Sequence, residues 1–486
     1  MFEVVKAEEF APLLLLILFY SNMKNIFSIV LLISTLLSCS KDDETYIPQE
    51  IDPNEQFSGG ETTTFDFSQN AFSIQATNLN NQEGLDFFVG NSLFNQNWVT
   101  APASTTARDG LGPLFNAHSC SGCHGDDGRG RPPLYTGEVD HGLLLRLSIF
   151  GTNANGGSLN EPNYGGQLQD QSILTIDTEA AFEISYQEIV GQYADGTSYT
   201  LQKPIYHITN LMYGPIANNI NISPRVANQM IGLGLLEAID ENTLLNFSDE
   251  NDSNSDGISG RPNYVWDVEN NSTKIGRFGW KANQPNLRQQ VAAAFNGDIG
   301  ITSTLFPLEN CPPGVDCNTL PNGGSPEIPD NNLNHVTLYS STLGVPARRN
   351  WDEIEIQEGK ALFNQINCNS CHIPQIVTGN HPTIDALSNQ IIRPYTDLLL
   401  HDMGDELSDN STDFLATGNE WRTPPLWGIG LIETVNGHTR LLHDGRARNM
   451  EEAILWHGGE AENSKIAFKN LDAINREKVI AFLNTL

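Results

Sequence analysis

Two stretches of the chain, "LFNAHSCSGCH" at residues 114–124 and "LFNQINCNSCH" at residues 362–372, share the skeleton L-F-N-x-x-x-C-x-x-C-H. Each stretch places two cysteines about one helical turn apart and a histidine directly after the second cysteine. The chain has 486 residues, which is enough for two or three domains. Because the same motif occurs once in each half, the sequence predicts two sites of the same kind.

The paired thiols are compatible with three kinds of site: half of a zinc site, a redox dithiol, and a covalent haem attachment. A zinc site would have its two cysteine pairs about 15 to 20 residues apart, but Cys120 and Cys368 lie in opposite halves of the chain. A redox dithiol does not require the histidine that follows both pairs. In a c-type site the two thiols bond to the haem vinyl groups and the next histidine ligates the iron.

We therefore predict two covalently bound c-type haems. The first is held by Cys120, Cys123 and His124, and the second by Cys368, Cys371 and His372. The L-F-N residues before each pair are expected to pack a helix against the haem, although Gly112 and Pro113 would delay that helix in the first copy.

The remaining cysteines fall into two groups. Cys311 and Cys317, in "CPPGVDC", are expected to form a small-loop disulfide, with two free thiols as the alternative. Cys39 ends the segment "MKNIFSIVLLISTLLSC", which begins at Met23 and continues with Lys24 and a short apolar run. This order resembles a bacterial lipoprotein leader, with an ordinary cleaved signal or a membrane anchor as the alternative.

On this interpretation residues 1–39 form the leader, its true start is Met23, and the polar residues 40–80 form a flexible tether. We expect an exported protein that faces the periplasm or is a surface lipoprotein of the outer membrane, with membrane contact through its lipid anchor only. The net charge of −33 would repel nucleic acid and anionic lipid. No nucleic-acid partner is expected.

Each half also contains a second similar segment, downstream of its cysteine pair. "FGWKANQPNLRQQVAAAFNGDIGIT" begins at Phe278, and "LHDGRARNMEEAILWHGGEAE" begins at Leu442. Both combine an aromatic or His-Asp-Gly element with a basic residue and alanine, and both continue into a helical pattern. The loose alignment indicates a duplicated cytochrome unit.

Many motifs within residues 80–486 resemble those of the di-haem oxidoreductase family. They are "CSGCHGDDGRGRPP", "EPNYGGQLQD", "SPRVANQMIGLGLLEAI", "DGISGRPNYV", "RFGWKANQPNLRQQ", "LLLHDMGDEL", "EWRTPPLWGIG" and "LHDGRARNMEEAILWHGGEA". More distantly, the haem motifs and the C-terminal segment resemble bacterial di-haem cytochrome c peroxidases and their MauG-like relatives. The resemblance implies an enzyme with one haem that transfers electrons and one that faces the substrate.

By this resemblance the C-terminal haem transfers electrons, and its second ligand lies on the helix after the His-Asp-Gly motif. His457 occupies that place in "EEAILWHGG", so His372 and His457 would ligate one iron from opposite sides. Met403 and the neighbouring His401 are the rival ligands. The alternative for His457 is a surface histidine at a helix end.

The resemblance also implies that the N-terminal haem faces the substrate, and His141 lies at the offset from His124 where the peroxidases carry a distal histidine. Without that ligand the iron would be open to peroxide. Gln290 and Asp298 match the glutamine and glutamate that move protons in the peroxidases, although with a shorter spacing and an aspartate. A turn or helix-cap carboxylate is the alternative for Asp298. The candidate partners of the haem propionates are Arg129, Arg131, Arg277 and Lys281.

The stretch "DSNSDGISG" resembles the opening of a calcium-binding loop. Asp252, Asn254 and Asp256 stand at alternate positions before Gly257. The twelfth position of such a loop is Asn263 rather than glutamate. A calcium ion is therefore one expectation, and a turn stabilised by these side chains is the other.

We expect a mainly α-helical protein with two cytochrome c-like haem domains and long irregular loops and insertions. After the tether, the expected parts are an N-terminal haem domain at 81–305, a linker loop with the disulfide at 306–345, and a C-terminal haem domain at 346–486. The predicted function is reduction of hydrogen peroxide, with electrons relayed between the haems from a small donor protein or a quinol-linked donor. The alternatives are a di-haem electron carrier and a MauG-like oxidation of a protein or organic substrate.

Overall fold

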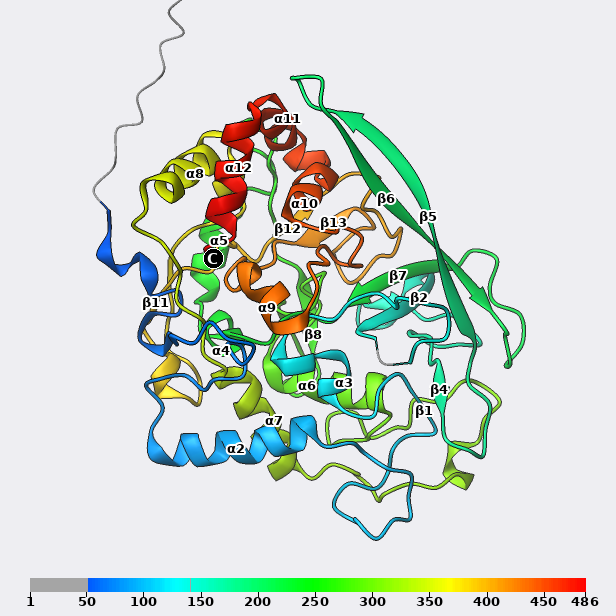
Figure 1. Cartoon of the computed structure of the whole chain (residues 1–486). Coiled ribbons are helices and arrows are strands. Elements are labelled where there is room, and N and C mark those ends of the chain that lie inside the picture. The colour runs from blue at the N-terminus through cyan, green and yellow to red at the C-terminus, as the bar shows by residue number, and fades with distance from the viewer. Residues whose placement is uncertain (1–50, 140) are drawn as a thin grey trace, which may run out of the picture. The chain divides into compact units, whose positions relative to one another are not determined.

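Helices and small sheets alternate along the described part of the chain, which is residues 51–139 and 141–486 of a computed structural model (Figure 1). Helix accounts for 29% and strand for 18%, so the expectation of a mainly α-helical fold is wrong. No helix within these residues is both long enough and apolar enough to cross a membrane.

The elements have the following bounds. The helices are α2 (Asn81–Asn95), α3 (Cys120–Cys123), α4 (Leu233–Glu237), α5 (Glu241–Phe247), α6 (Leu287–Ala294), α7 (Asp330–Thr342), α8 (Ile354–Gln365), α9 (Ile432–Asn436), α10 (Met450–Trp456), α11 (Glu462–Asn470) and α12 (Ala473–Leu483). The 3₁₀ and π turns are η1 (Pro53–Gln56), η2 (Gly60–Thr62), η3 (Gly125–Asp127), η4 (Phe295–Ile299), η5 (Cys317–Thr319), η6 (Cys368–Ser370), η7 (Asp385–Leu387), η8 (Ile429–Leu431) and η9 (Gly459–Ala461). The strands are β1 (Leu114–Phe115), β2 (Leu143–Thr152), β3 (Ser158–Leu159), β4 (Gln171–Ser172), β5 (Ala181–Gln192), β6 (Ser198–Thr209), β7 (Asn221–Val226), β8 (Tyr264–Asp267), β9 (Ser272–Ile275), β10 (Ile376–Val377), β11 (Ile391–Ile392), β12 (Leu400–Asp402) and β13 (Glu420–Arg422).

The strands pair into small antiparallel sheets, and the longest of them lie between the first cysteine pair and α6. β2 pairs with β3 and β7, while β5 pairs with β6 in a register that runs from Ala181↔Thr209 to Gln192↔Ser198. Along β5, Phe182 and Ile184 alternate with polar residues and pack against the core. This alternation is the strand signal in segments that were expected to be irregular, and it explains the wrong fold class.

The long β5–β6 ribbon reaches from the first half of the chain to helices of the second half (Figure 1). In the loop between its strands, the hydroxyl of Tyr193 donates a hydrogen bond to Oε1 of Glu451 in α10 at 2.7 Å. Asp195 accepts a hydrogen bond from the guanidinium of Arg476 in α12 at 2.9 Å. The ribbon thereby ties the two halves together.

Each half is built on a pair of crossed helices, α2 with α7 in the first half and α8 with α12 in the second. A glycine marks both crossings. A side chain at Gly90 would meet the carbonyl of His335, and one at Gly359 would meet the carbonyl of Lys478. Only glycine permits two helix backbones to approach so closely.

An aromatic pair lies beside each crossing. The ring centroid of Phe94 in α2 is 5.2 Å from that of Tyr339 in α7. The centroid of Phe363 in α8 is likewise 5.2 Å from that of Phe482 in α12. All four rings are buried, so each crossing carries its own aromatic contact.

The L-F-N at residues 362–364, in α8, therefore does not correspond in the structure to the L-F-N at residues 114–116. "GNSLFNQ" at residues 90–96, in α2, matches "GKALFNQ" at residues 359–365, in α8. Leu114–Phe115 form strand β1 and pair with β4 instead. The expected helix does not form there because the backbone of Gly112 lies directly against that of Gly300, which leaves no room for it.

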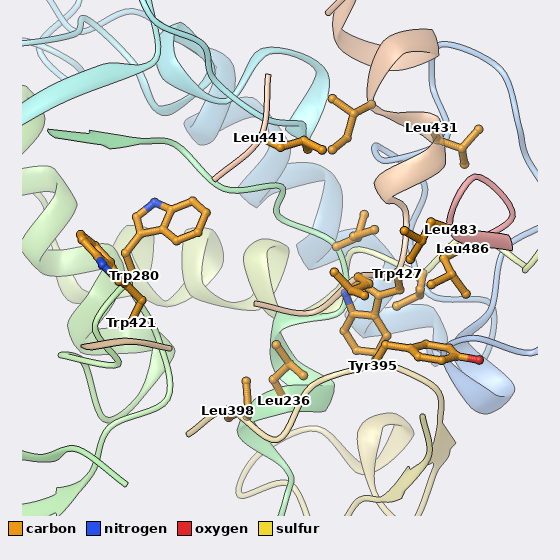
Figure 2. Packing of buried hydrophobic residues seen from close by; sticks show 14 of the residues in the cluster. Leu236, Trp280, Tyr395, Leu398, Trp421, Trp427, Leu431, Leu441, Leu483 and Leu486 are labelled. Atoms are coloured by element: carbon orange, nitrogen blue, oxygen red, sulfur yellow. The ribbon is translucent and has the colours of Figure 1, made fainter. Parts of the chain in front are cut away.

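The largest hydrophobic cluster joins both halves. It includes Leu236 and Trp280 from the first half and Tyr395, Trp427 and Leu483 from the second, several of which are drawn in Figure 2. Burial of each such side chain contributes about 1.5–3 kcal/mol to stability. Residues from 51 to 486 group into one unit, and the division predicted at residues 305 and 345 stays a prediction.

The chain is packed from residue 51 onward, including the part that was expected to belong to a tether. Ala71 and Phe72 are fully buried, and Thr64 forms a backbone bridge with Pro346. Apolar side chains in an otherwise polar segment thus anchor it to the core. The predicted leader and Cys39 lie outside the described residues.

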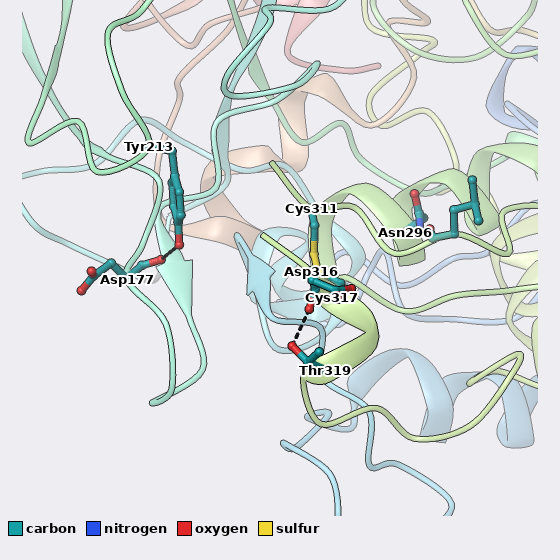
Figure 3. The surroundings of a disulfide bond; sticks show 8 residues. Asp177, Tyr213, Asn296, Cys311, Asp316, Cys317 and Thr319 are labelled. Atoms are coloured by element: carbon teal, nitrogen blue, oxygen red, sulfur yellow. Dashed lines mark hydrogen bonds between the residues drawn. A yellow bond between two sulfur atoms is a disulfide. The ribbon is translucent and has the colours of Figure 1, made fainter. Parts of the chain in front are cut away.

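The disulfide between Cys311 and Cys317 is confirmed (Figure 3). It closes a small loop between η4 and α7. Next to it, the hydroxyl of Thr319 donates a hydrogen bond to the carbonyl of Asp316 at 2.7 Å. The loop is thus held by a covalent bond and by local turn hydrogen bonds.

Candidate haem-binding sites

The first cysteine pair lies in α3, and His124 follows at the C-terminal end of this short helix. The Nδ1–H of His124 donates to the carbonyl of Asn228 at 2.7 Å, and the ring of Phe94 lies 6.2 Å from the imidazole. Burial lowers the pKa of His124, so the ring is neutral. The hydrogen bond at Nδ1 leaves the lone pair of Nε2 for a metal.

The second cysteine pair repeats this arrangement. Cys368 begins η6, the Nδ1–H of His372 donates to the carbonyl of Tyr395 at 2.9 Å, and the ring of Phe363 lies 6.3 Å away. The interplanar angle is 52° in both histidine–phenylalanine pairs. Burial, with a contribution from nearby His457, lowers the pKa of His372 to about 4.

Both motifs line one cavity of about 430 Å³. Among the described residues the four cysteines of the motifs form no disulfide. Burial raises the pKa of the Cys120 thiol and of the Cys368 thiol to about 12. Neutral imidazoles, thiols outside disulfides and an internal space therefore occur together, and these residues fit a pair of covalently attached haems.

The second repeated segment forms a hairpin followed by a helix in each half. Phe278 pairs with Gln284 before α6, and Leu441 pairs with Ala447 before α10. Both pairs are antiparallel bridges that span the same number of residues. The loose alignment of the sequences thus corresponds to one repeated structure.

Backbone conformations inside the two hairpins match position by position. Gly279 and Leu442, which follow the first residue of each bridge, have φ of 78° and 68°. Ala282 and Gly445, three residues further on, have φ of 48° and 73°. Positive φ at a leucine and an alanine is uncommon, so the shared pattern identifies these positions as counterparts.

The same asparagine caps the helix in each half. Oδ1 of Asn286 accepts from the third N–H of α6 at 2.8 Å, and Oδ1 of Asn449 accepts from the third N–H of α10 at 2.9 Å. His457 stands eight residues after Asn449, and Ala294 stands eight residues after Asn286. His457 and Ala294 are therefore counterparts.

His457 lies directly after α10, at the place predicted for the second ligand of the C-terminal haem. It lines the cavity together with His372, and its Nδ1–H donates to the carbonyl of Ala453 at 2.6 Å. Burial lowers the pKa of His457, so its Nε2 also keeps a lone pair. The geometry supports the assignment of His457, which stays a prediction.

In the first half the corresponding place holds no ligating atom. Ala294 lines the cavity with a methyl group, and Gln290 lies one turn earlier on the same face of α6 and also lines the cavity. The predicted proton-handling residue Gln290 thus lies one turn from the counterpart of His457.

Asp298 follows in η4 and lines the same cavity. Its Oδ1 accepts a hydrogen bond from Nε2 of Gln167 at 2.9 Å. Burial raises the pKa of Asp298, against the opposing effects of Gln167 and of the charge of Arg146. The carboxylate binds a side chain rather than a helix N-terminus, so the cap alternative does not describe it.

The rival ligands Met403 and His401 also line the cavity. Nε2 of His401 lies 2.9 Å from Asp397 and its Nδ1 lies 2.7 Å from Glu460. Although burial lowers the pKa of His401, Asp397 beside it raises that pKa well above its usual value. With both ring nitrogens bound to carboxylates, His401 has no lone pair left for an iron.

His141 does not lie in the large cavity. It lines a separate space of about 70 Å³. Its Nδ1 accepts from the backbone N–H of Leu143 at 3.2 Å, and its Nε2 lies 3.5 Å from Asp170. The structure therefore gives no support to His141 as a distal ligand.

One of the four predicted propionate partners, Arg129, lines the large cavity. Lys281 pairs with a buried aspartate at 3.1 Å, and Arg131 pairs with a glutamate at 2.7 Å. The guanidinium of Arg277 donates to a backbone carbonyl at 3.2 Å. None of these three side chains lines the large cavity.

The comparison with known families agrees with this site. A family model described as "Di-haem oxidoreductase, putative peroxidase" matches residues 53–486. The chain belongs to this family. Membership supports haem cofactors and an oxidoreductase enzyme, in line with the two repeated motifs.

The other comparisons add little to the family assignment. A solved structure of hydrazine synthase from Kuenenia stuttgartiensis, pressurised with xenon, is similar over 92% of this chain and 98% of that chain. The identity is 12% and the TM-score is 0.33. A search of curated proteins finds no match.

The proposed calcium loop of this di-haem oxidoreductase is folded on itself. Asn254 and Asp256 are exposed, and the N–H of Asp256 donates to Oδ1 of Asn254 at 2.9 Å. The carboxylate of Asp252 accepts from the N–H of Gly257 at 3.2 Å. These bonds are those of a self-stabilised turn, and a calcium ion stays a prediction.

Sequence reasoning gave no role to Gln167 and Arg146. Nη1 of Arg146 donates to Oε1 of Gln167 at 2.8 Å, and Nε2 of Gln167 donates both to Asp298 at 2.9 Å and to Asn116 at 2.7 Å. Gln167 therefore fixes the carboxylate of Asp298. Its place in the motif "EPNYGGQLQD" was the available signal, but the contact joins residues 131 positions apart.

Proposed function

We propose that this di-haem oxidoreductase binds two covalent c-type haems and reduces hydrogen peroxide. His124 and His372 would ligate the irons, and the cysteine pairs beside them would bond to the haem vinyl groups. When bound, the haems supply the iron centres that exchange electrons with the peroxide. The carbonyls of Asn228 and Tyr395 hold the two imidazoles in the orientation and tautomer that such ligation requires.

The contrast between His457 and Ala294 carries the proposal. These counterparts line the same cavity, one beside each motif, but only the histidine offers a ligating nitrogen. With haems bound, His372 and His457 would hold one iron from both sides, as suits electron transfer, while the first site would leave a position for a small substrate. An electron carrier with two closed sites would need a ligand where Ala294 stands.

The residues on the open side suit proton handling. Reduction of one hydrogen peroxide to two waters takes up two electrons and two protons. Asp298, whose pKa is raised by burial, would take a proton from one peroxide oxygen and return it to the other. Gln290 lies on the same wall of the cavity and would orient the substrate through its amide.

The electron source and the location of the protein complete the proposal. We expect a small donor protein or a quinol-linked donor to supply electrons through the C-terminal haem. The net charge of −33 would favour a donor with a basic surface. Export as a lipoprotein rests on the leader pattern that ends at Cys39.

The test is to install the missing ligand. Ala294→His should give the first site a second imidazole, so that both haems become low-spin and peroxide reduction is lost. Ala294→Leu is the matched control, because it fills the same space without a ligating atom and should not create the low-spin signal. EPR spectra and peroxide consumption of the haem-loaded proteins are the measurements.

His457→Gly provides the reciprocal change. It should convert the C-terminal site from low-spin to high-spin and leave the spectrum of the other site unchanged. A wild-type protein with two low-spin sites that ignore peroxide would overturn the proposal. An unchanged spectrum in His457→Gly would reject the ligand assignment alone.

A further inference from the structure

Besides Arg225, the cavity between the motifs is lined by two further buried arginines, Arg129 from the first half and Arg422 from the second. They are 5% and 6% exposed. Within residues 51–139 and 141–486 neither guanidinium has a carboxylate at ion-pair distance; their hydrogen bonds go to backbone carbonyls. Burial lowers the pKa of both to about 10, which is the effect of a charge removed from water without a close counter-ion.

Each arginine reaches across to the hairpin of the opposite half. Arg129 donates through Nε to the carbonyl of Arg440 at 2.8 Å and through Nη2 to the carbonyl of Leu442. Arg422 donates through Nε to the carbonyl of Gly279 at 2.9 Å. Since Gly279 and Leu442 are counterparts, the two contacts are reciprocal.

Both guanidinium groups keep unused donors. An arginine carries five N–H donors, and among the described residues Nη1 of Arg129 and Nη2 of Arg422 have no hydrogen-bond acceptor. Neither atom is sealed inside the protein, unlike Nη2 of Arg348, which agrees with their position on the cavity wall. Arg225 lines the same cavity but is paired with Asp413 at 3.2 Å.

A buried cation with unused donors is costly unless an anion compensates it. We propose that Arg129 and Arg422 bind the propionate carboxylates of the two haems, one arginine from each half. A planar guanidinium matches a carboxylate through two parallel hydrogen bonds. This inference rests on the proposed haem binding, and it replaces Arg131, Arg277 and Lys281 as propionate partners.

The reciprocal contacts give this pairing a second consequence. Each arginine would join a propionate to the hairpin that leads into α6, which ends at Ala294, or into α10, which ends directly before His457. The arginine that compensates the propionate charge would thus also fix the hairpin before α6 or α10. The carboxylate of a free small molecule could bind the two arginines in the same way as a haem propionate. The experiment therefore has to distinguish these two ligands.

The experiment compares charge-removing and charge-keeping variants of the haem-loaded protein. Arg129→Gln and Arg422→Gln should each lower the reduction potential of a haem, because a nearby positive charge stabilises the reduced state. Arg129→Lys and Arg422→Lys should retain most of the wild-type potential. Arg131→Gln, whose partner Glu138 lies outside the cavity, is the control and should leave both potentials unchanged. Spectroelectrochemical titration measures them.

Formate is the probe for the alternative that Arg129 and Arg422 bind a free small carboxylate. Wild-type spectra that do not respond to formate support propionate binding. A saturable spectral change that the glutamine variants abolish would assign the arginines to a free carboxylate and overturn the inference. Potentials that are the same in the glutamine variants and in the wild type would overturn it too, while leaving the proposed function intact. A protein that takes up no haem would instead overturn the proposed function.

Discussion

The two haem-binding halves place the same imidazole in the same way with very different lengths of chain. The carbonyl that accepts from His124 belongs to Asn228, 104 residues later, whereas the carbonyl that accepts from His372 belongs to Tyr395, 23 residues later. The sheets of β2–β7 fill the difference in the first half. The orientation of a proximal histidine thus depends on one well-placed carbonyl and not on the segment that supplies it.

The halves differ in polarity where their helices cross. In the first half the hydroxyl of Tyr339 donates to Oδ1 of Asp127 at 2.6 Å, and Ser73 donates to Oδ2 at 2.6 Å. In the second half the counterpart of Tyr339 is Phe482, which has no hydroxyl. The half with the proposed open site therefore carries a buried carboxylate three residues after His124.

The largest effects should come from the rings that the two halves share. Phe94→Ala and Phe363→Ala should each lower the free energy of unfolding by about 3–5 kcal/mol, because each leaves a cavity between the helix crossing and the imidazole. Denaturant titration of the haem-loaded protein measures both. Phe88→Ala, on the same helix as Phe94 but 63% exposed, should change little. A large loss of stability in only one of the variants Phe94→Ala and Phe363→Ala would show that the two helix crossings are not equivalent.

A smaller effect should separate the halves by pH. Burial raises the pKa of Asp127 to about 6, above its unfolded value, so the folded state binds more protons between about pH 4 and pH 6. The contribution of Asp127 to the free energy of unfolding is therefore fully present below about pH 4. It is lost as the pH rises through about 6, which lowers the free energy of unfolding by roughly 3 kcal/mol in all.

Asp127→Asn should remove this part of the pH dependence and be more stable than the wild type above pH 6. Denaturant midpoints across the pH range, taken as the difference between the two proteins, isolate the contribution of Asp127. Asp126→Asn, at the exposed neighbouring position, should keep most of the dependence. A pH-independent difference between wild type and Asp127→Asn would contradict the assignment.

The smallest expected change tests the helix crossings directly. Gly90→Ala and Gly359→Ala should each destabilise the protein by about 1–3 kcal/mol, because the new methyl group meets a backbone carbonyl of the partner helix. Gly84→Ala in α2 meets only ordinary contacts and should stabilise by up to about 1 kcal/mol. Thermal unfolding curves give the sign. Stabilisation by either crossing variant would reject the close approach of the helices.

Local patterns in the sequence carry most of the predictions about the site. The cysteine pairs with their histidines, the disulfide of Cys311 and Cys317, and the repeated segment that ends near His457 are each read from a few consecutive residues. Each depends on short-range chemistry: the proposed attachment of a haem to neighbouring cysteines, the closure of a small loop, and the end of a helix. The disulfide is confirmed, and the repeated segments form matching hairpins.

The errors have different physical origins. The first L-F-N stretch looked like a helix start, but Gly112 packs against the backbone of Gly300, which is a long-range contact that no local pattern reveals. The longest strands that changed the fold class, β5 and β6, form a hairpin, and the alternation of apolar and polar residues along β5 was a local signal. The proposed open site depends on Ala294, and an alanine becomes informative only when its counterpart His457 is known.

The β5–β6 ribbon bears on whether such a molecule can be divided. The repeated motifs of the chain suggest two cytochrome units, each of which could be expressed or inherited without the other. Yet the loop of the ribbon, encoded with the first copy, forms one hydrogen bond each with Glu451 and Arg476 of the second copy. A gene fragment for the second copy alone would lack both bonds, one on the helix that leads to His457 and one on α12, and Arg476 would keep its bond to the carbonyl of Leu471. An insertion in one copy has become part of the support of the other.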